Sequence, residues 1–263
     1  MIGIFDSGLG GLTVVKELFK YLPEYKIVYF GDSARLPYGT KGPDFVKKYS
    51  LKISEFLFKQ GAKIIIIACH TATSWAEDYL KRSISIPVFG IINPSLDKVI
   101  STTKNKRIGI IGTPGTIKSK NWEKKLLSKD SKLKIYTQSC PLFVPLVEEG
   151  WERKKIAKEI IREYLSPLKQ KKIDTLVMAC THYPLLEKQI KEFLGKEIFM
   201  INPSRELVFE LRRFLKNNHQ IEKKLTKSNN HIFFFSDIPY NLEKISNHYF
   251  KRKINPVIKK LFI

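Results

Sequence analysis

The sequence predicts an α/β fold composed of two similar lobes, each built on a mainly parallel sheet. Short apolar runs alternate with amphipathic stretches along the chain, and three segments recur in the same order at nearly constant spacing. The 263 residues are enough for two ordinary domains, and the 43% of hydrophobic residues can fill their cores.

The expected strands are short runs rich in isoleucine and valine. Runs that are apolar throughout are typical of parallel strands covered on both faces by helices. The expected strands are Ile2–Phe5, Ile27–Phe30, Ile64–Ala68, Val88–Ile92, Arg107–Ile111, Lys134–Thr137, Thr175–Ala179 and Ile198–Ile201, and the C-terminal segment adds one more, His231–Phe235. The expected helices include Thr13–Leu22, Asp44–Gln60, Ala76–Arg82, Ala157–Leu168 and Glu206–Leu215, and a polar loop is expected over Asn217–Asn230.

Three repeated segments indicate an internal duplication. Arg107-Ile108-Gly109-Ile110 resembles Met1-Ile2-Gly3-Ile4 at an offset of 106 residues from Ile2 to Ile108; Cys180 lies 111 residues after Cys69, and Asn202 lies 109 residues after Asn93, each pair with similar neighbours. We therefore expect two lobes related by a pseudo-twofold axis. Residues 1–94 with 206–263 would form the first lobe, and residues 95–205 the second. Because α/β folds bind ligands beyond the carboxyl ends of their strands, the active site is expected in the cleft between the lobes.

The net charge of +22 is typical of nucleic-acid-binding proteins. The lysines are scattered along the chain without a recognised nucleic-acid motif, which favours a compositional bias. Charge alone predicts a salt-sensitive affinity for polyanions. A basic protein that binds nucleic acid is therefore an alternative from a different functional class.

The cysteines and the N-terminal segment predict a reduced, cytoplasmic protein. Residues 1–6 contain an acid and no basic stretch, unlike a secretory signal, and the longest apolar run, Ile64 to Cys69, is too short for a membrane span. The three cysteines, Cys69, Cys140 and Cys180, are expected to be free thiols. No pair has the CxxC spacing of a structural zinc site, and no metal is expected.

Two of these cysteines are candidates for acid/base chemistry. Cys69 and Cys180 each follow a buried strand, at equivalent positions of the duplicated unit. A single cysteine in such a place is more often a small buried apolar residue. A pair in facing lobes, however, would present two thiols to a substrate from opposite sides. Racemisation needs this arrangement, because one base removes the α-proton and an acid returns a proton to the other face.

Other polar residues follow the expected strands. The glycine-rich turn that begins at Asp6 and Ser7 lacks the spacing of nucleotide-binding loops, so its amides and hydroxyl are expected to face an anion, with Asp6 against an ammonium group. Pro37-Tyr38-Gly39 is either an ordinary turn or one wall of the pocket. Thr71, Thr181 and His182 stand where they can favour a thiolate.

At these residues the sequence closely resembles glutamate racemases over nearly its full length. The resemblance lies in Asp6-Ser7-Gly8, Pro37-Tyr38-Gly39, Ala68-Cys69, the segment from Cys140 to Leu146, and Cys180-Thr181-His182-Tyr183-Pro184. It implies a cytoplasmic homodimer that interconverts L- and D-glutamate without a cofactor and supplies D-glutamate for peptidoglycan. Some glutamate racemases also inhibit DNA gyrase, so the alternative of a basic binding protein includes a protein that acts on nucleic acid or on DNA gyrase.

The resemblance also implies roles for individual residues. Cys69 and Cys180 would be the catalytic acid/bases, assisted by Asp6 and His182. The substrate would lie against these four and against Ser7, Pro37, Tyr38, Gly39, His70, Thr71, Thr181 and Glu148. Cys140 has no counterpart in the other lobe and is expected to be structural.

The sequence departs from the family at three positions. His70 replaces the usual asparagine, and Asn93 and Asn202 replace acids at equivalent points of the two lobes. A charged His70 would lower the pKa of Cys69, and its bulk would reshape the pocket. Because of His70, a related racemase that acts on another amino acid, such as aspartate, is an alternative function.

Overall fold

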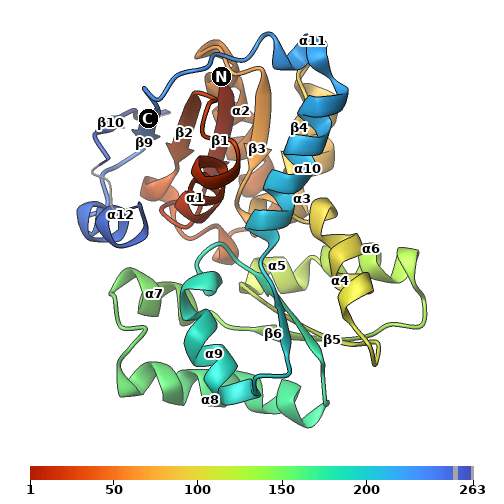
Figure 1. Cartoon of the computed structure of the whole chain (residues 1–263). Coiled ribbons are helices and arrows are strands. Elements are labelled where there is room, and N and C mark those ends of the chain that lie inside the picture. Colours follow the sequence, from red (N-terminus) through yellow and green to blue (C-terminus); the bar gives the residue numbers. More distant parts are fainter. Residues whose placement is uncertain (251–253, 262–263) are drawn as a thin grey trace.

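The chain, described here by a computed structural model, forms two lobes stacked on each other (Figure 1). The structure describes residues 1–250 and 254–261, without the side chains of residues 248–250. The first lobe is built on a six-stranded sheet with the order β10-β9-β2-β1-β3-β4, and the second on a four-stranded sheet with the order β6-β5-β7-β8. The first sheet contains β1 (Ile2–Asp6), β2 (Ile27–Gly31), β3 (Ile64–Ile67), β4 (Val88–Gly90), β9 (Ile232–Phe235) and β10 (Pro256–Ile258). The second contains β5 (Arg107–Gly112), β6 (Lys134–Ser139), β7 (Thr175–Ala179) and β8 (Phe199–Ile201).

The two sheets share one arrangement of strands. Among the described residues, every ladder between named strands is parallel. The order β2-β1-β3-β4 in the first sheet corresponds to β6-β5-β7-β8 in the second. This correspondence confirms the predicted α/β fold with two duplicated lobes.

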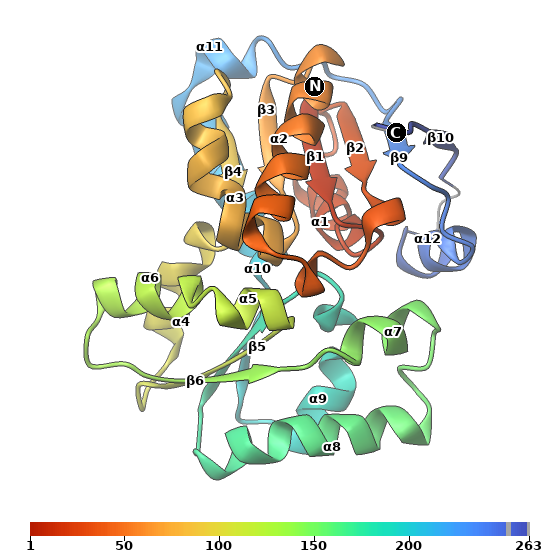
Figure 2. The same cartoon turned by 180° about the vertical axis from the view of Figure 1, so that it is seen from behind.

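Helices cover both faces of the first sheet (Figure 2). Successive residues of a strand point to opposite faces. Accordingly Ile64 and Ile66 pack with α1 (Leu12–Tyr21) and α10 (Pro203–Asn217), whereas Ile65 and Ile67 pack with α2 (Pro43–Lys59) and α3 (His70–Ser83). Because both faces of β3 are buried, all of its residues can be isoleucine.

The second sheet is covered in the same way. On one face Leu176 and Met178 pack with α7 (Phe143–Glu148), α8 (Lys155–Gln170) and α9 (Glu187–Leu194). On the other face Val177 joins a core shared with the first lobe, which includes α4 (Leu96–Thr102) and α6 (Asn121–Lys129). The remaining helical segments are α5 (Pro114–Lys118), α11 (His219–Glu222), α12 (Leu242–Phe250), η1 (Ser33–Arg35), η2 (Tyr38–Thr40), η3 (Asn93–Ser95) and η4 (Tyr183–Leu186). The shared core holds the lobes together behind the cleft.

Two expected elements differ from the structure. The helix expected over Ala76–Arg82 already begins at His70, directly after Cys69. Its first turn, His70 to Thr73, is buried although it is mostly polar, so apolar periodicity does not reveal it. The polar loop expected over Asn217–Asn230 contains the short helix α11.

The chain crosses between the lobes twice, after β4 and between β8 and α10. β9 then pairs with β2, and β10 pairs with β9, so both strands extend the first sheet. On this basis we propose the division into residues 1–94 with 206–263 and residues 95–205; residues 251–253 and 262–263 lie outside the described part. No helix in the described chain is long and apolar enough to span a membrane.

Candidate active site

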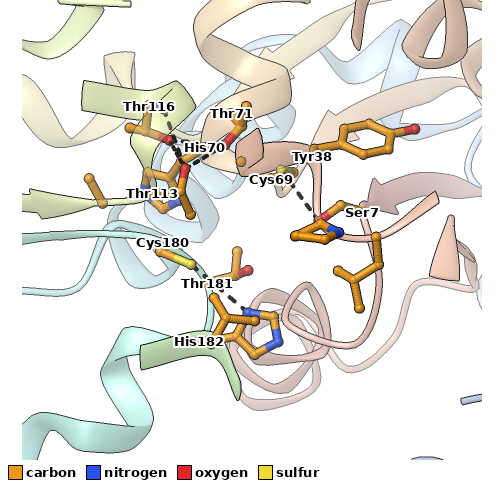
Figure 3. Close-up of a pocket in the computed structure, with 15 residues that line it drawn as sticks. Ser7, Tyr38, Cys69, His70, Thr71, Thr113, Thr116, Cys180, Thr181 and His182 are labelled. Carbon is orange, nitrogen blue, oxygen red and sulfur yellow. Dashed lines mark hydrogen bonds between the residues drawn. The ribbon is translucent and has the colours of Figure 1, made fainter. Parts of the chain in front are cut away.

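A pocket lies between the lobes, at the carboxyl ends of β3, β5 and β7 (Figure 3). About 320 Å³ of space here is not filled by protein atoms, counting the part that is open to solvent. Its lining residues are Ser7, Leu36, Pro37, Tyr38, Gly39, Cys69, His70 and Thr71 from the first lobe and Thr113, Thr116, Val144, Ala179, Cys180, Thr181 and His182 from the second. Of the site residues expected from the sequence, Asp6 and Glu148 are the two that do not line this pocket. Both instead contact residues that do.

Asp6 ends β1 and supports the turn above the pocket. Its buried carboxylate accepts hydrogen bonds from the amide of Gly8 at 3.0 Å and from the hydroxyl of Thr181 at 3.4 Å. Burial raises the pKa of Asp6, although the charge of His182 opposes the rise. The turn packs directly on the second lobe, because a Cβ atom on Gly10 would lie 2.6 Å from the His182 ring. Only glycine permits this approach.

Cys69 lies between the end of β3 and the start of α3. Its sulfur is 3.7 Å from the hydroxyl oxygen of Ser7. Burial raises the pKa of the Cys69 thiol to about 12, and the charge of Asp6 adds to this rise, while the Ala72 amide and Ser7 act against it. At neutral pH Cys69 is therefore a protonated thiol that can donate a proton.

Cys180 follows β7 and lies across the pocket from Cys69 (Figure 3). Its sulfur is 3.9 Å from Nδ1 of His182, and Nε2 of the same ring is 3.1 Å from Oε1 of Glu148. Burial alone would lower the pKa of His182, but the interactions with Cys180 and Glu148 outweigh burial and raise it to about 10. The ring is therefore a cation at neutral pH, and it lies directly beside the Cys180 sulfur.

The pocket therefore has a protonated thiol on one side and, on the other side, a cysteine sulfur next to a cationic imidazole ring. Residues 3–208 of the chain match the sequence profile of Asp/Glu/Hydantoin racemases. The chain belongs to this family.

Similar proteins cover nearly the whole chain. It is 41% identical over 256 residues to a glutamate racemase of Geobacter metallireducens, spanning 97% of this chain and 94% of the relative. A glutamate racemase of Aquifex pyrophilus is 42% identical over 92% of this chain and 91% of its own length. The predicted resemblance to glutamate racemases is therefore confirmed.

Solved structures agree with this assignment. The glutamate racemase of Bacillus anthracis superposes with a TM-score of 0.92 at 36% identity, covering 99% of this chain and 97% of that protein. The glutamate racemase of Francisella tularensis in complex with D-glutamate gives a TM-score of 0.89 at 35% identity, covering 98% and 96%. An aspartate racemase homologue of Pyrococcus horikoshii, at 16% identity and a TM-score of 0.58, shares the fold.

Three hydroxyl groups form one wall of this pocket, and the sequence predicts only one of them. The hydroxyls of Thr71, Thr113 and Thr116 lie 2.9 to 3.1 Å from one another. Thr113 lies 106 residues after Ser7, which is also the spacing from Ile2 to Ile108. Ser7 and Thr113 lie three residues beyond the matched segments, so extending the repeat identifies Thr113 as the counterpart of Ser7.

Pro37, Tyr38 and Gly39 form a pocket wall, which decides between the two readings left open by the sequence. The Tyr38 hydroxyl points away from the pocket and donates a hydrogen bond to Oδ2 of Asp32 at 2.6 Å (Figure 3). Gly39 touches the second lobe, because a Cβ atom there would lie 2.6 Å from Cβ of Thr113. This segment therefore presents its main chain and the body of the Tyr38 ring to the pocket.

His70 lines the pocket as a neutral side chain. Burial lowers the pKa of His70 to about 3, and its ring stacks on Trp122 with centroids 6.2 Å apart. Among the described residues neither ring nitrogen has a hydrogen-bond partner. The expectation that a charged His70 would lower the pKa of Cys69 is therefore wrong, because a buried imidazole without an acidic neighbour stays neutral.

The other departures from the family lie away from the pocket. Asn93 donates a hydrogen bond to buried Glu77 at 2.9 Å and accepts one from Lys125 at 2.8 Å. Asn202 caps α10 by accepting a hydrogen bond from the amide of Ser204 at 3.1 Å. Both asparagines therefore have structural partners, and neither lines the pocket.

Cys140 is fully buried in the core of the second lobe. Burial raises the pKa of its thiol. Its carbonyl oxygen accepts a hydrogen bond at 2.8 Å from the hydroxyl of Tyr183, which follows the catalytic candidates Cys180 and His182. Cys140 thus packs behind the site, outside the pocket lining.

Proposed function

We propose that the protein interconverts L- and D-glutamate by a two-base reaction in which Cys69 and Cys180 are the acid/bases. The observation that carries this proposal is the placement of two thiols from equivalent strands on opposite sides of one pocket, in unlike electrostatic environments. The names of the relatives support glutamate as the substrate.

In one direction the thiolate of Cys180 removes the α-proton and becomes a thiol. The electron pair left on Cα delocalises into the α-carboxylate. The thiol of Cys69 then donates its proton to the opposite face of Cα and becomes a thiolate, so that the other enantiomer starts from the reverse protonation state. Because the α-proton is a weak acid, the developing charge needs fixed donors in a site that excludes water. Ser7, Thr71 and Thr181 supply hydroxyl donors in a pocket whose lining is largely buried.

The remaining roles follow from the contacts. Asp6 is proposed to face the substrate ammonium through the turn that it supports, and His182 with Glu148 to stabilise the thiolate of Cys180. Pro37, Tyr38, Gly39 and neutral His70 complete the substrate-binding wall. We further propose a cytoplasmic homodimer that supplies D-glutamate for peptidoglycan, with only a salt-sensitive affinity for polyanions arising from the net charge of +22.

Circular dichroism of L-glutamate and D-glutamate, incubated separately with the purified protein and no added cofactor, tests the proposal. Both signals are expected to decay to zero. A parallel panel of amino acids, followed by α-proton exchange in heavy water, measures specificity. Exchange with aspartate but not with glutamate would instead support the alternative substrate, and unchanged signals with both thiols reduced would overturn the two-base proposal.

A further inference from the structure

A segment of the first lobe reaches the second lobe directly behind the catalytic histidine. Asn241 precedes α12 and is 6% exposed. Its side-chain Nδ2 donates a hydrogen bond to the main-chain oxygen of Glu148 at 2.8 Å. Glu148 is the last residue of α7, so this bond holds the main chain where the helix ends.

Asn241 is itself fixed by the core of the first lobe. The next residues of α12, Leu242 and Ile245, are buried in the apolar core that also contains α1. The amide of Ile245 donates a hydrogen bond to the Asn241 carbonyl at 2.9 Å, which ties Asn241 to the first turn of α12. The side chain of Asn241 is therefore presented to Glu148 from a packed support.

Glu148 in turn contacts the reacting groups through one intermediary. Its carboxylate binds Nε2 of His182 at 3.1 Å, and Nδ1 of His182 lies 3.9 Å from the Cys180 sulfur. The Glu148 side chain is 18% exposed, so water competes for its carboxylate unless the main chain of Glu148 is held in place. A continuous series of contacts thus runs from the first-lobe core through Asn241, Glu148 and His182 to Cys180.

We propose that Asn241 is a positioning residue for the proposed racemase reaction, which holds the Glu148 carboxylate against His182 by fixing the Glu148 main chain. Asn241 does not line the pocket and acts only through Glu148. Through this contact, the charge state of His182 in the second lobe depends on how α12 packs against the first lobe.

Two neighbouring contacts provide matched controls. The Tyr240 hydroxyl donates a hydrogen bond to the Glu149 carboxylate, and Nζ of Lys244 lies 3.1 Å from the Glu149 carbonyl oxygen. Both bridge the same two segments but contact Glu149 rather than Glu148. If any contact between the two segments had the same effect, Tyr240→Phe and Lys244→Met would change the protein in the same way as the loss of the Asn241 side chain.

Titration of His182 by NMR of the labelled imidazole ring tests the proposal without requiring turnover. In the wild-type protein the midpoint is expected near 10. Asn241→Leu, which keeps the volume but removes the donor, and Asn241→Ala are each expected to lower this midpoint by about 1 pH unit, because a mobile carboxylate stabilises the cation less. Tyr240→Phe and Lys244→Met are expected to leave it unchanged.

A double-mutant cycle identifies the route of the effect. In a Glu148→Gln background, Asn241→Leu should cause no further change in the His182 midpoint or in kcat, whereas in the wild-type background it should lower kcat and leave KM unchanged. Equal effects in both backgrounds, equal effects of the control variants, or an unchanged midpoint in folded Asn241→Leu would overturn the proposal. Wild-type protein that titrates as expected but does not racemise glutamate would overturn the proposed function instead.

Discussion

Replacing Glu148 by glutamine tests whether the ion pair with His182 sustains proton transfer at Cys180. Glutamine has nearly the same shape, so the variant loses the charge and keeps a hydrogen-bonding group. The pKa of His182 is about 10 compared with the ordinary value of 6.5, a difference worth about 5 kcal/mol. Cys180 and Glu148 share this stabilisation, and partial exposure weakens the contribution of Glu148, which we take as about 2 kcal/mol. This energy corresponds to a loss of about 30-fold in kcat/KM if it acts fully in the transition state.

Initial rates in both directions, measured from pH 6 to pH 10, provide the assay. Because His182 loses its proton at lower pH in Glu148→Gln, the alkaline limb of the rate profile is expected to move to lower pH. Glu149→Gln is the matched control, since the neighbouring carboxylate contacts Tyr240 and not His182. A Glu148→Gln variant with the wild-type rate and pH profile would refute the role of the ion pair.

Two further predictions concern the fold and the closure of the cleft. His70 has a pKa of about 3 in the folded chain, so the unfolded chain binds the proton first and stability falls as the pH decreases from 6.5 towards 3. His70→Asn should flatten this dependence in urea denaturation, and an identical slope in the variant would contradict it. Gly39→Ala should lower kcat/KM by at least about tenfold without unfolding the chain, because the new Cβ atom meets Thr113 and separates the lobes. Gly42→Ala, where a Cβ atom meets nothing within 4 Å, should retain activity. Equal kinetics of the two variants would show that the close approach of Gly39 to Thr113 is not needed for activity.

The sequence predicted the central strands well because their burial on both faces leaves continuous apolar runs. Ile64–Ile67 is such a run, and the spacing from Cys69 to Cys180 matches the spacing of their strands. Strand β10 was not predicted, because it is only three residues long and exposes Val257 and Ile258 at the sheet edge. Local pattern carries little information about so short an edge strand.

Long-range contacts explain what sequence reasoning missed in the site. The charge of His70 depends on burial against Trp122, more than fifty residues further along the chain, which no local motif reports. The hydroxyl cluster joins Thr71 to Thr113 across the two lobes, and Asn241 meets Glu148 only after α12 docks on the first lobe. Such pairings arise from tertiary packing, and they show how the fold completes a site whose thiols the repeat had located.

The most direct test of the two-base account is the rate of glutamate racemisation by Cys69→Ser, Cys180→Ser and Cys140→Ala, assayed in parallel in both directions. Serine is a much weaker acid than cysteine, so each of the first two variants should lose racemisation by orders of magnitude. Cys140→Ala changes a buried thiol outside the pocket lining and should keep most of the activity. Racemisation at the wild-type rate by either Cys69→Ser or Cys180→Ser would contradict the account.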